Sequence, residues 1–306
     1  MSVDYSVPMG EMTLRTPLLT GSGTFGFGDE YRSLIDYSSF GGIVTKSISL
    51  EPRIGNPPNR ICETSAGGLL NSIGLANPGV EQFITDKVSL LPMDLTKVFL
   101  SVVGNTVEEF IAVIGRLETV EGVSGYELNV SCPNVKVGGL DIGGDKEAVA
   151  LIVREVRSVT DRFLSVKLTP NQPAIAPMAE VAAHEGADAL TLTNTLIGMA
   201  VDAGRQRPML GTFTGGYSGP PLKPVSLAKV WQASQVVDIP IWASGGIVTG
   251  LDGIEFILAG ASALQLGSVL FADPYAPDRV LGEMVDYCVR HGVEQLSDLI
   301  GKLKDV

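Results

Sequence analysis

The stretch PIWASGGIVTGLDGIEFILAGASALQLGSVL spans residues 240–270 and contains two apolar runs with a helical segment between them. The runs 240–247 and 263–270 have the apolar character of buried strands, and each runs into glycine and serine. Between them, 251–259 carries apolar residues at three- and four-residue spacing, which is typical of an amphipathic helix. A strand, a helix and a second strand in this order predict a parallel βαβ unit.

Similar runs recur along the chain, so the whole sequence predicts an eightfold alternation of strand and helix. Six further candidate strands cover 17–24, 42–48, 98–104, 125–131, 164–169 and 189–195. Further helix-like segments lie at 107–118, 145–159, 176–185 and 227–237. Eight such strands in a chain of 306 residues predict an α/β fold of the (β/α)8 TIM-barrel type. The rival fold, a doubly wound open sheet, needs no eighth strand and usually carries a GxGxxG turn, which follows no strand here.

Three segments extend the expected barrel. The first residues alternate as in a β-hairpin, and two insertions rich in Gly, Pro, Asn and Ser cover 50–94 and 195–224. Both insertions follow strand C-termini, the end at which barrels carry their active sites, so we expect them to cover a site. No linker or low-complexity stretch divides the chain, so 1–306 is predicted to form a single domain.

The composition excludes several classes of function. Lys and Arg number 22 against 34 Asp and Glu, and the formal net charge of −12 argues against a nucleic-acid partner. Three Cys and two His in no metal-ligand spacing predict neither a disulfide framework nor a metal site. We find no signal-peptide pattern and no run of about 20 apolar residues, so we expect a cytoplasmic protein without a membrane span. Only 18% of residues are charged, which indicates that some surface is buried against other chains.

Two lysines end apolar strands, Lys46 after the second and Lys167 after the fifth. Each ammonium needs a partner inside a pocket, either an anionic ligand or a carboxylate. No Asp or Glu closes a neighbouring strand, apart from Glu127 within the fourth, so contact with a ligand is favoured over a structural ion pair. A Schiff-base lysine, as in barrel aldolases, is a third interpretation.

Glycines follow the last two strands, in the pairs Gly245-Gly246 and Gly267-Ser268. Glycine lets the backbone approach a phosphate closely, and phosphate binding after the seventh and eighth strands recurs in barrels. Simple turn glycines are the alternative. Glycines at both strand ends favour a phosphate site.

Cys132 follows the fourth strand between Asn129 and Asn134, in a stretch that should face the pocket. A lone cysteine is more often a small buried hydrophobe, but this setting favours a base or a nucleophile. Asparagine donates and accepts hydrogen bonds at once. Turn chemistry alone would account for the loop around Asn71, but Asn71, Asn129, Asn134 and Asn194 together predict a pocket for a polar planar ring.

Nine segments together resemble the dihydroorotate dehydrogenases over essentially the whole chain. They are SGTFGFG (22–28), TKSIS (45–49), NSIGLANPG (71–79), ELNVSCPNVKVGG (127–139), VKLTPN (166–171), TLTNTLIGMAVD (191–202), GGYSGPPLKPVSL (215–227), ASGGIVTG (243–250) and LQLGSVLF (264–271). Any one of them alone would be weak, whereas the ordered series is highly specific. The resemblance implies an FMN-containing barrel that oxidises (S)-dihydroorotate to orotate in the de novo synthesis of UMP.

The resemblance also implies roles for individual residues. Cys132 would be the base that removes a proton from the dihydropyrimidine ring, while a hydride passes from the adjacent ring carbon to the flavin. Substrate contacts would come from Lys46, Asn71, Ser72, Ile73, Gly74, Leu75, Asn129, Asn194 and Thr195. FMN would be held by Ser22, Lys46, Ser47, Ser101, Asn129, Lys167, Thr193, Gly219, Gly245, Gly246, Gly267 and Ser268. Ser101 stands where family members often carry Asn at the flavin edge.

A cysteine base implies the soluble class 1 of this family, and three motifs resemble its NAD-linked type B: NSIGLANPG, TLTNTLIGM and GGYSGP. That type is a heterotetramer, in which a homodimer of catalytic subunits binds a second subunit that carries FAD and a [2Fe–2S] cluster. Alternatives are the fumarate-linked class 1 homodimer, a dihydropyrimidine dehydrogenase-like barrel acting on uracil or thymine, a phosphate-sugar isomerase, and a non-catalytic assembly subunit. Lys46 favours a substrate with a carboxylate, which dihydroorotate has.

Overall fold

The structure, a computed structural model, describes residues 3–131, 136–137, 140–141 and 144–304. Its centre is a closed barrel of eight parallel strands. These strands are β3 (Leu18–Thr20), β4 (Gly42–Val44), β7 (Lys97–Val102), β8 (Gly125–Asn129), β11 (Phe163–Leu168), β12 (Ala189–Leu192), β17 (Ile241–Ser244) and β18 (Ala263–Leu266). Each pairs with the next along the chain, and β18 pairs with β3 to close the ring. The predicted (β/α)8 barrel is confirmed.

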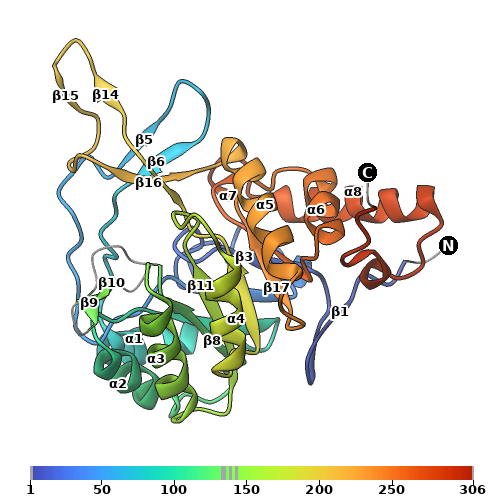
Figure 1. The fold of residues 1–306 in the computed structure, drawn as a ribbon, viewed down its shortest axis with the longest axis horizontal. Coiled ribbons are helices and arrows are strands. Elements are labelled where there is room, and N and C mark those ends of the chain that lie inside the picture. Colours follow the sequence, from blue (N-terminus) through green and yellow to red (C-terminus); the bar gives the residue numbers. More distant parts are fainter. Residues whose placement is uncertain (1–2, 132–135, 138–139, 142–143, 305–306) are drawn as a thin grey trace.

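Helices cover the outside of the barrel (Figure 1). The α-helices are α1 (Val80–Asp86), α2 (Val107–Leu117), α3 (Lys146–Arg157), α4 (Ala176–His184), α5 (Lys223–Ser234), α6 (Gly250–Leu258), α7 (Val269–Ala272) and α8 (Ala276–His291). Short 3-10 helices are η1 (Tyr37–Ser39), η2 (Val88–Leu90), η3 (Pro220–Leu222) and η4 (Leu296–Leu299). Helix α5 begins earlier than predicted because Pro224 stands in its first turn, where a missing N–H costs nothing. Within the described ranges, no helix is long and apolar enough to cross a membrane.

The lowest layer inside the barrel is aromatic. Side chains alternate along a strand, so every second residue points inward. The rings of Phe99 and Phe163 lie 4.9 and 5.7 Å from that of Trp242, between centroids. The hairpin of β1 (Val7–Met9) and β2 (Met12–Leu14) contributes to the same buried cluster. The predicted N-terminal hairpin is therefore confirmed, and it packs against the base of the barrel.

A polar layer lies above the aromatic one. Its inward-pointing members, all buried, are Ser101, Glu127, Ser165, Thr191 and Gln265. The strand register places Ser101 and Ser165 opposite Glu127 from either side. The next inward-pointing residues, two positions further along each strand, form the third layer at the C-terminal end of the barrel.

The two insertions form a second sheet at this end of the barrel. It is antiparallel, in the order β13 (Leu196–Gly198), β16 (Gly215–Ser218), β6 (Leu69–Asn71) and β5 (Ile61–Glu63). Smaller two-stranded pairs are β9 (Lys136–Val137) with β10 (Leu140–Asp141) and β14 (Val201–Asp202) with β15 (Arg207–Pro208). Figure 1 shows the β14–β15 hairpin and the β5–β6 hairpin projecting away from the barrel. The sequence predicted two insertions over the site but not their pairing with each other.

Candidate active site

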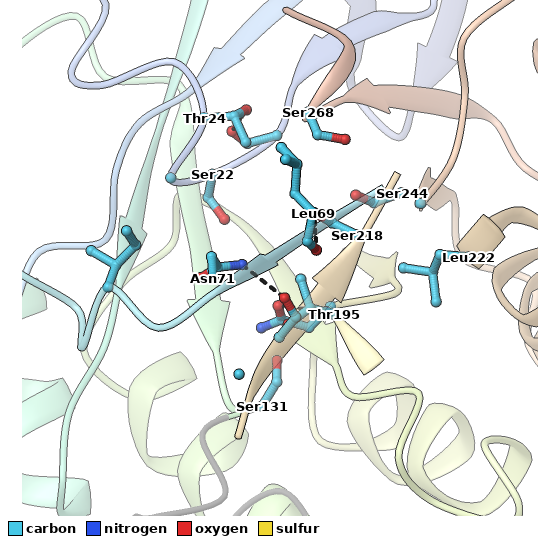
Figure 2. A pocket seen from close by; sticks show the side chains of 18 of the residues that line it. Ser22, Thr24, Leu69, Asn71, Ser131, Thr195, Ser218, Leu222, Ser244 and Ser268 are labelled. Carbon is cyan, nitrogen blue, oxygen red and sulfur yellow. Dashed lines mark hydrogen bonds between the residues drawn. The ribbon is translucent and has the colours of Figure 1, made fainter. Parts of the chain in front are cut away.

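A cavity of about 670 Å³ lies between the strand ends and the sheet of the insertions. Figure 2 shows Ser22, Ser244 and Ser268, which follow or end barrel strands, together with Leu69 and Asn71 of the insertion sheet among the side chains that line it. Cavities of about 300–1,000 Å³ take ligands of cofactor size. Strand ends and both insertions therefore build one candidate site.

Most of the residues predicted from the sequence line this cavity. Of the predicted substrate contacts these are Lys46, Asn71, Ser72, Ile73, Gly74, Leu75, Asn129, Asn194 and Thr195. Of the predicted cofactor contacts they are Ser22, Lys46, Ser47, Asn129, Lys167, Thr193, Gly219, Gly245, Gly246, Gly267 and Ser268. Cys132 lies outside the described residues, although Ser131 directly before it lines the cavity. The structure thus brings these residues together, and their roles stay predictions.

Ser101 is the exception among the predicted cofactor contacts, and its contact with FMN stays a prediction. It is fully buried on β7 and does not line the cavity. Its hydroxyl lies 2.9 Å from that of Ser47, which does line the cavity. Ser101 points inward one layer below the strand ends, so its hydroxyl supports that of Ser47 from beneath.

Several polar lining residues were not predicted from the sequence. Asn56 Nδ2 and Thr212 Oγ1 donate to Ser72 Oγ at 2.8 and 2.7 Å. These three residues meet only because the two insertions pair, which no local pattern reveals. Ser131 and Ser244 also line the cavity, and their place at strand ends was a signal that could have identified them.

Hydrogen bonds orient the amide of Asn129 at the floor of the cavity. Its Oδ1 accepts from Asn194 Nδ2 at 3.3 Å and from Ser131 Oγ at 3.0 Å, while its Nδ2 donates to Ser47 Oγ at 3.4 Å. Opposite, Asn71 Nδ2 donates to the carbonyl of Gly216 at 3.2 Å, the bond dashed in Figure 2. Donors and acceptors side by side can pair with a ring that carries amide or imide groups.

The two lysines lie in different electrostatic settings. The Lys167 ammonium donates to Ser22 Oγ at 2.9 Å and lies 3.7 Å from Glu127 Oε1, so this lysine has the carboxylate neighbour that the sequence disfavoured. Burial lowers the pKa of Lys46, the carboxylate of Glu30 raises it in part, and a nearby guanidinium lowers it again. No described residue accepts a hydrogen bond from the Lys46 ammonium or forms an ion pair with it. Lys46 is therefore the cation best placed for a ligand carboxylate.

Backbone amides of two loops form an anion cradle. The N–H groups of Gly245, Gly246, Gly267 and Ser268 donate no hydrogen bond to any described residue, and all four residues line the cavity. At Gly246 φ is +77° and a Cβ would lie 2.7 Å from the backbone nitrogen of Lys223, so this path of the chain requires glycine. Free backbone N–H groups that line a cavity can bind phosphate oxygens, which makes these four residues a candidate anion cradle.

Comparison with known proteins now identifies the family. A family model described as dihydroorotate dehydrogenase matches residues 6–287. The chain belongs to the dihydroorotate dehydrogenase family. The resemblance inferred from the nine sequence segments is thereby confirmed.

Relatives of this family member match nearly its whole length. It is 46% identical over 301 residues to "Dihydroorotate dehydrogenase B (NAD(+)), catalytic subunit" of Geobacter sp. (strain M21), covering 98% of each chain. Relatives of the same name from Geobacter sulfurreducens and Pelobacter propionicus are each 45% identical and cover 98% and 100% of their own lengths, and 98% and 99% of this chain. A crystal structure of DHODH in complex with ferulenol from Eimeria tenella matches with a TM-score of 0.80 at 24% identity, over 98% of this chain and 88% of that chain. That likeness supports the barrel fold.

The other two cysteines of this dihydroorotate dehydrogenase family member lie apart from the cavity. Cys62 on β5 is half-buried and Cys288 in α8 is buried, and burial raises the pKa of both thiols. Neither lines the cavity. In the part of the chain that the structure describes, no group of three or more His, Cys, Asp or Glu side chains could hold a metal ion.

Proposed function

We propose that this chain oxidises (S)-dihydroorotate to orotate in de novo pyrimidine synthesis, as the catalytic subunit of an NAD-linked dihydroorotate dehydrogenase. One observation carries the proposal. A continuous cavity joins a cradle of free backbone N–H groups to a floor of amides and lysines. A flavin phosphate and a pyrimidine carboxylate need these two kinds of site close together, and the curated relatives bear the corresponding name.

FMN fits the residues of this cavity. The N–H groups of Gly245, Gly246, Gly267 and Ser268 would hold its phosphate, because nothing described competes for them. Lys167, which lines the floor, would offer positive charge to the ring system. Bound FMN supplies the acceptor for a hydride and its two electrons.

The remaining polar groups suit dihydroorotate. Lys46 would bind the substrate carboxylate, since its ammonium has no described partner. Asn71, Asn129 and Asn194 would pair with the amide and imide groups of the ring. Cys132 would take the proton from ring carbon 5 as the hydride leaves carbon 6, so that a carbon–carbon double bond forms and orotate results.

We further propose that the chain works in the cytoplasm as a homodimer with a partner subunit that carries FAD and a [2Fe–2S] cluster. The word "subunit" in the relatives' name supports a separate partner. Large apolar side chains on the insertions, Ile54 at 90% and Phe213 at 76% exposure, leave surface for such contacts. Co-purification of an orange-brown complex with a smaller iron–sulfur protein would support the NAD-linked type, and reoxidation by fumarate would support the fumarate-linked alternative.

Anaerobic reduction of the purified, FMN-loaded protein tests the proposed reaction. Dihydroorotate should bleach the yellow flavin, whereas dihydrouracil, which lacks the carboxylate, should bleach it far more slowly. Equal bleaching by both would favour a dihydropyrimidine dehydrogenase-like enzyme. A colourless protein that does not take up FMN would overturn the proposal, and borohydride trapping at Lys46 or Lys167 would point to Schiff-base chemistry.

A further inference from the structure

A carboxylate lies buried inside the barrel, beneath the floor of the cavity. Glu127 on β8 is fully buried and does not line the cavity. Its Oε2 accepts hydrogen bonds from Thr191 Oγ1 at 3.0 Å and from Gln265 Nε2 at 2.6 Å. Its Oε1 has no hydrogen-bond partner and lies 3.7 Å from Lys167 Nζ. Three neighbouring elements thus hold one carboxylate with one oxygen turned toward the lysine.

A buried carboxylate destabilises a protein unless its charge is compensated. Thr191 and Gln265 are neutral donors, and a neutral glutamine at position 127 could accept from them equally well. What a neutral side chain could not provide is negative charge beside Lys167. The charge of Glu127 therefore serves the lysine and not the hydrogen-bond network.

Lys46 is a buried lysine that forms no ion pair with a described carboxylate, and burial lowers its pKa. Lys167 is more deeply buried, at 4% exposure. The eight barrel strands carry two other titratable side chains. Lys97 is exposed, and the hydroxyl of Tyr126 donates outside the barrel to Glu118 at 2.8 Å. Within these strands only Glu127 can compensate the charge of Lys167.

We propose that Glu127 is a positioning residue for the flavin site: its carboxylate compensates the buried charge of Lys167 and holds the ammonium at the cavity. The ammonium can then stabilise negative charge as the flavin is reduced. This inference rests on the proposed function, because the charge acts on a flavin only if FMN occupies the cavity. Thr191 and Gln265 fix the carboxylate, so that its free oxygen faces the lysine.

Glu127→Gln tests the proposal, since it removes the charge while keeping the size and a hydrogen-bond acceptor. We would measure its effect on the midpoint potential of bound FMN in the wild-type background and in the Lys167→Met background. With Lys167 present, the potential should fall, because the ammonium is no longer held beside the flavin. In the Lys167→Met background it should not fall, because only a negative charge is removed. An equal shift in both backgrounds would overturn the proposal.

Thermal unfolding of the FMN-free protein gives a second readout. In Glu127→Gln the buried Lys167 ammonium loses its compensating charge, so the unfolding temperature should drop. The drop should be much smaller in the Lys167→Met background, where no ammonium needs compensation. Thr191→Val, which removes one hydrogen bond and no charge, should lower the unfolding temperature equally in both backgrounds. An equal loss in both backgrounds for Glu127→Gln would make Glu127 merely structural.

A double variant covers the case in which Glu127→Gln does not fold. Adding Lys167→Met removes the uncompensated ammonium, so folding should be recovered. A double variant that also fails to fold would overturn the proposal. If the effects of Glu127→Gln depend on Lys167 but dihydroorotate does not reduce the flavin, the proposed function fails while the role of Glu127 toward Lys167 stands.

Discussion

Substituting Gly246 with alanine is expected to disrupt the anion cradle while the barrel still folds. An alanine at φ +77° costs about 1–2 kcal/mol. Its Cβ would lie 2.7 Å from the backbone nitrogen of Lys223 and 2.8 Å from that residue's Cβ. Relieving this overlap displaces backbone on one side or the other, typically at a further cost of about 1–3 kcal/mol. We therefore expect the free energy of unfolding to fall by about 2–5 kcal/mol.

The displacement should also weaken FMN binding. Loss of one hydrogen bond to a charged group costs about 1.5–3 kcal/mol, which corresponds to a Kd raised about 10- to 150-fold. Quenching of flavin fluorescence on titration of the FMN-free protein measures this Kd, and urea unfolding measures the stability.

Gly282→Ala is the matched control for this substitution. Gly282 lies within α8, and no atom lies within 4 Å of an added Cβ. Alanine in a helix interior is favoured over glycine by about 0.5–1 kcal/mol, so this variant should be at least as stable as the wild type and bind FMN equally well. If Gly246→Ala bound FMN as tightly as the wild type, the assignment of the cradle would be refuted.

Three other substitutions test separate parts of the site. Because burial lowers the pKa of Lys46, its ammonium titrates below the ordinary lysine range, so KM for dihydroorotate should rise as pH increases through that lowered pKa. Lys46→Met should show a high KM without this rise, and a wild-type KM that stays constant up to the ordinary lysine pKa would contradict the assignment. Burial raises the pKa of Asp252, but hydrogen bonds from Lys223 and from the backbone N–H groups of Val248 and Thr249, just before α6, outweigh this and lower the pKa below its ordinary value. The stability from these bonds is therefore present above the unfolded pKa and lost as pH falls through the folded one. Asp252→Asn should cost about 1–2 kcal/mol at neutral pH and little in acid, and an equal cost at both pH values in urea unfolding would contradict this. Cys132→Ser should retain FMN but slow flavin reduction about 10²- to 10⁴-fold in stopped-flow measurements, and normal reduction would exclude Cys132 as the base.

The centres of the barrel strands were predictable because apolar runs and helical spacing alternate along the chain. Their C-terminal ends were not. The expected strand 189–195 ends at Leu192, and 17–24 ends at Thr20. Beyond those points the chain keeps single backbone hydrogen bonds to neighbouring strands, such as that from the Asn194 N–H to the Leu168 carbonyl, and brings Asn194 and Ser22 to the cavity. Composition does not reveal where ladder hydrogen bonds stop, because the polar residues that follow suit either state.

The site was predictable to the extent that barrel strands bring their ends together. Contacts set by strand register or by long-range pairing were not. Glu127 was noticed in the sequence, but its approach to Lys167 was not predictable. It follows from the strand register, which pairs Lys167 with Asn129, the next inward-pointing residue after Glu127 on β8. The bond from Asn71 to Gly216 joins residues 145 positions apart. The burial of Ser101 beneath Ser47 was not predictable for the same reason, since a strand pattern shows which way a side chain faces and not how deep it lies.

An anaerobic titration of the FMN-loaded protein with (S)-dihydroorotate, followed by quantification of orotate, tests the central claim most directly. We expect the flavin to be fully bleached, with one orotate formed for each FMN reduced, because the ring loses one proton and one hydride. A flavin that stays oxidised, or that is bleached without formation of orotate, would contradict the proposed reaction.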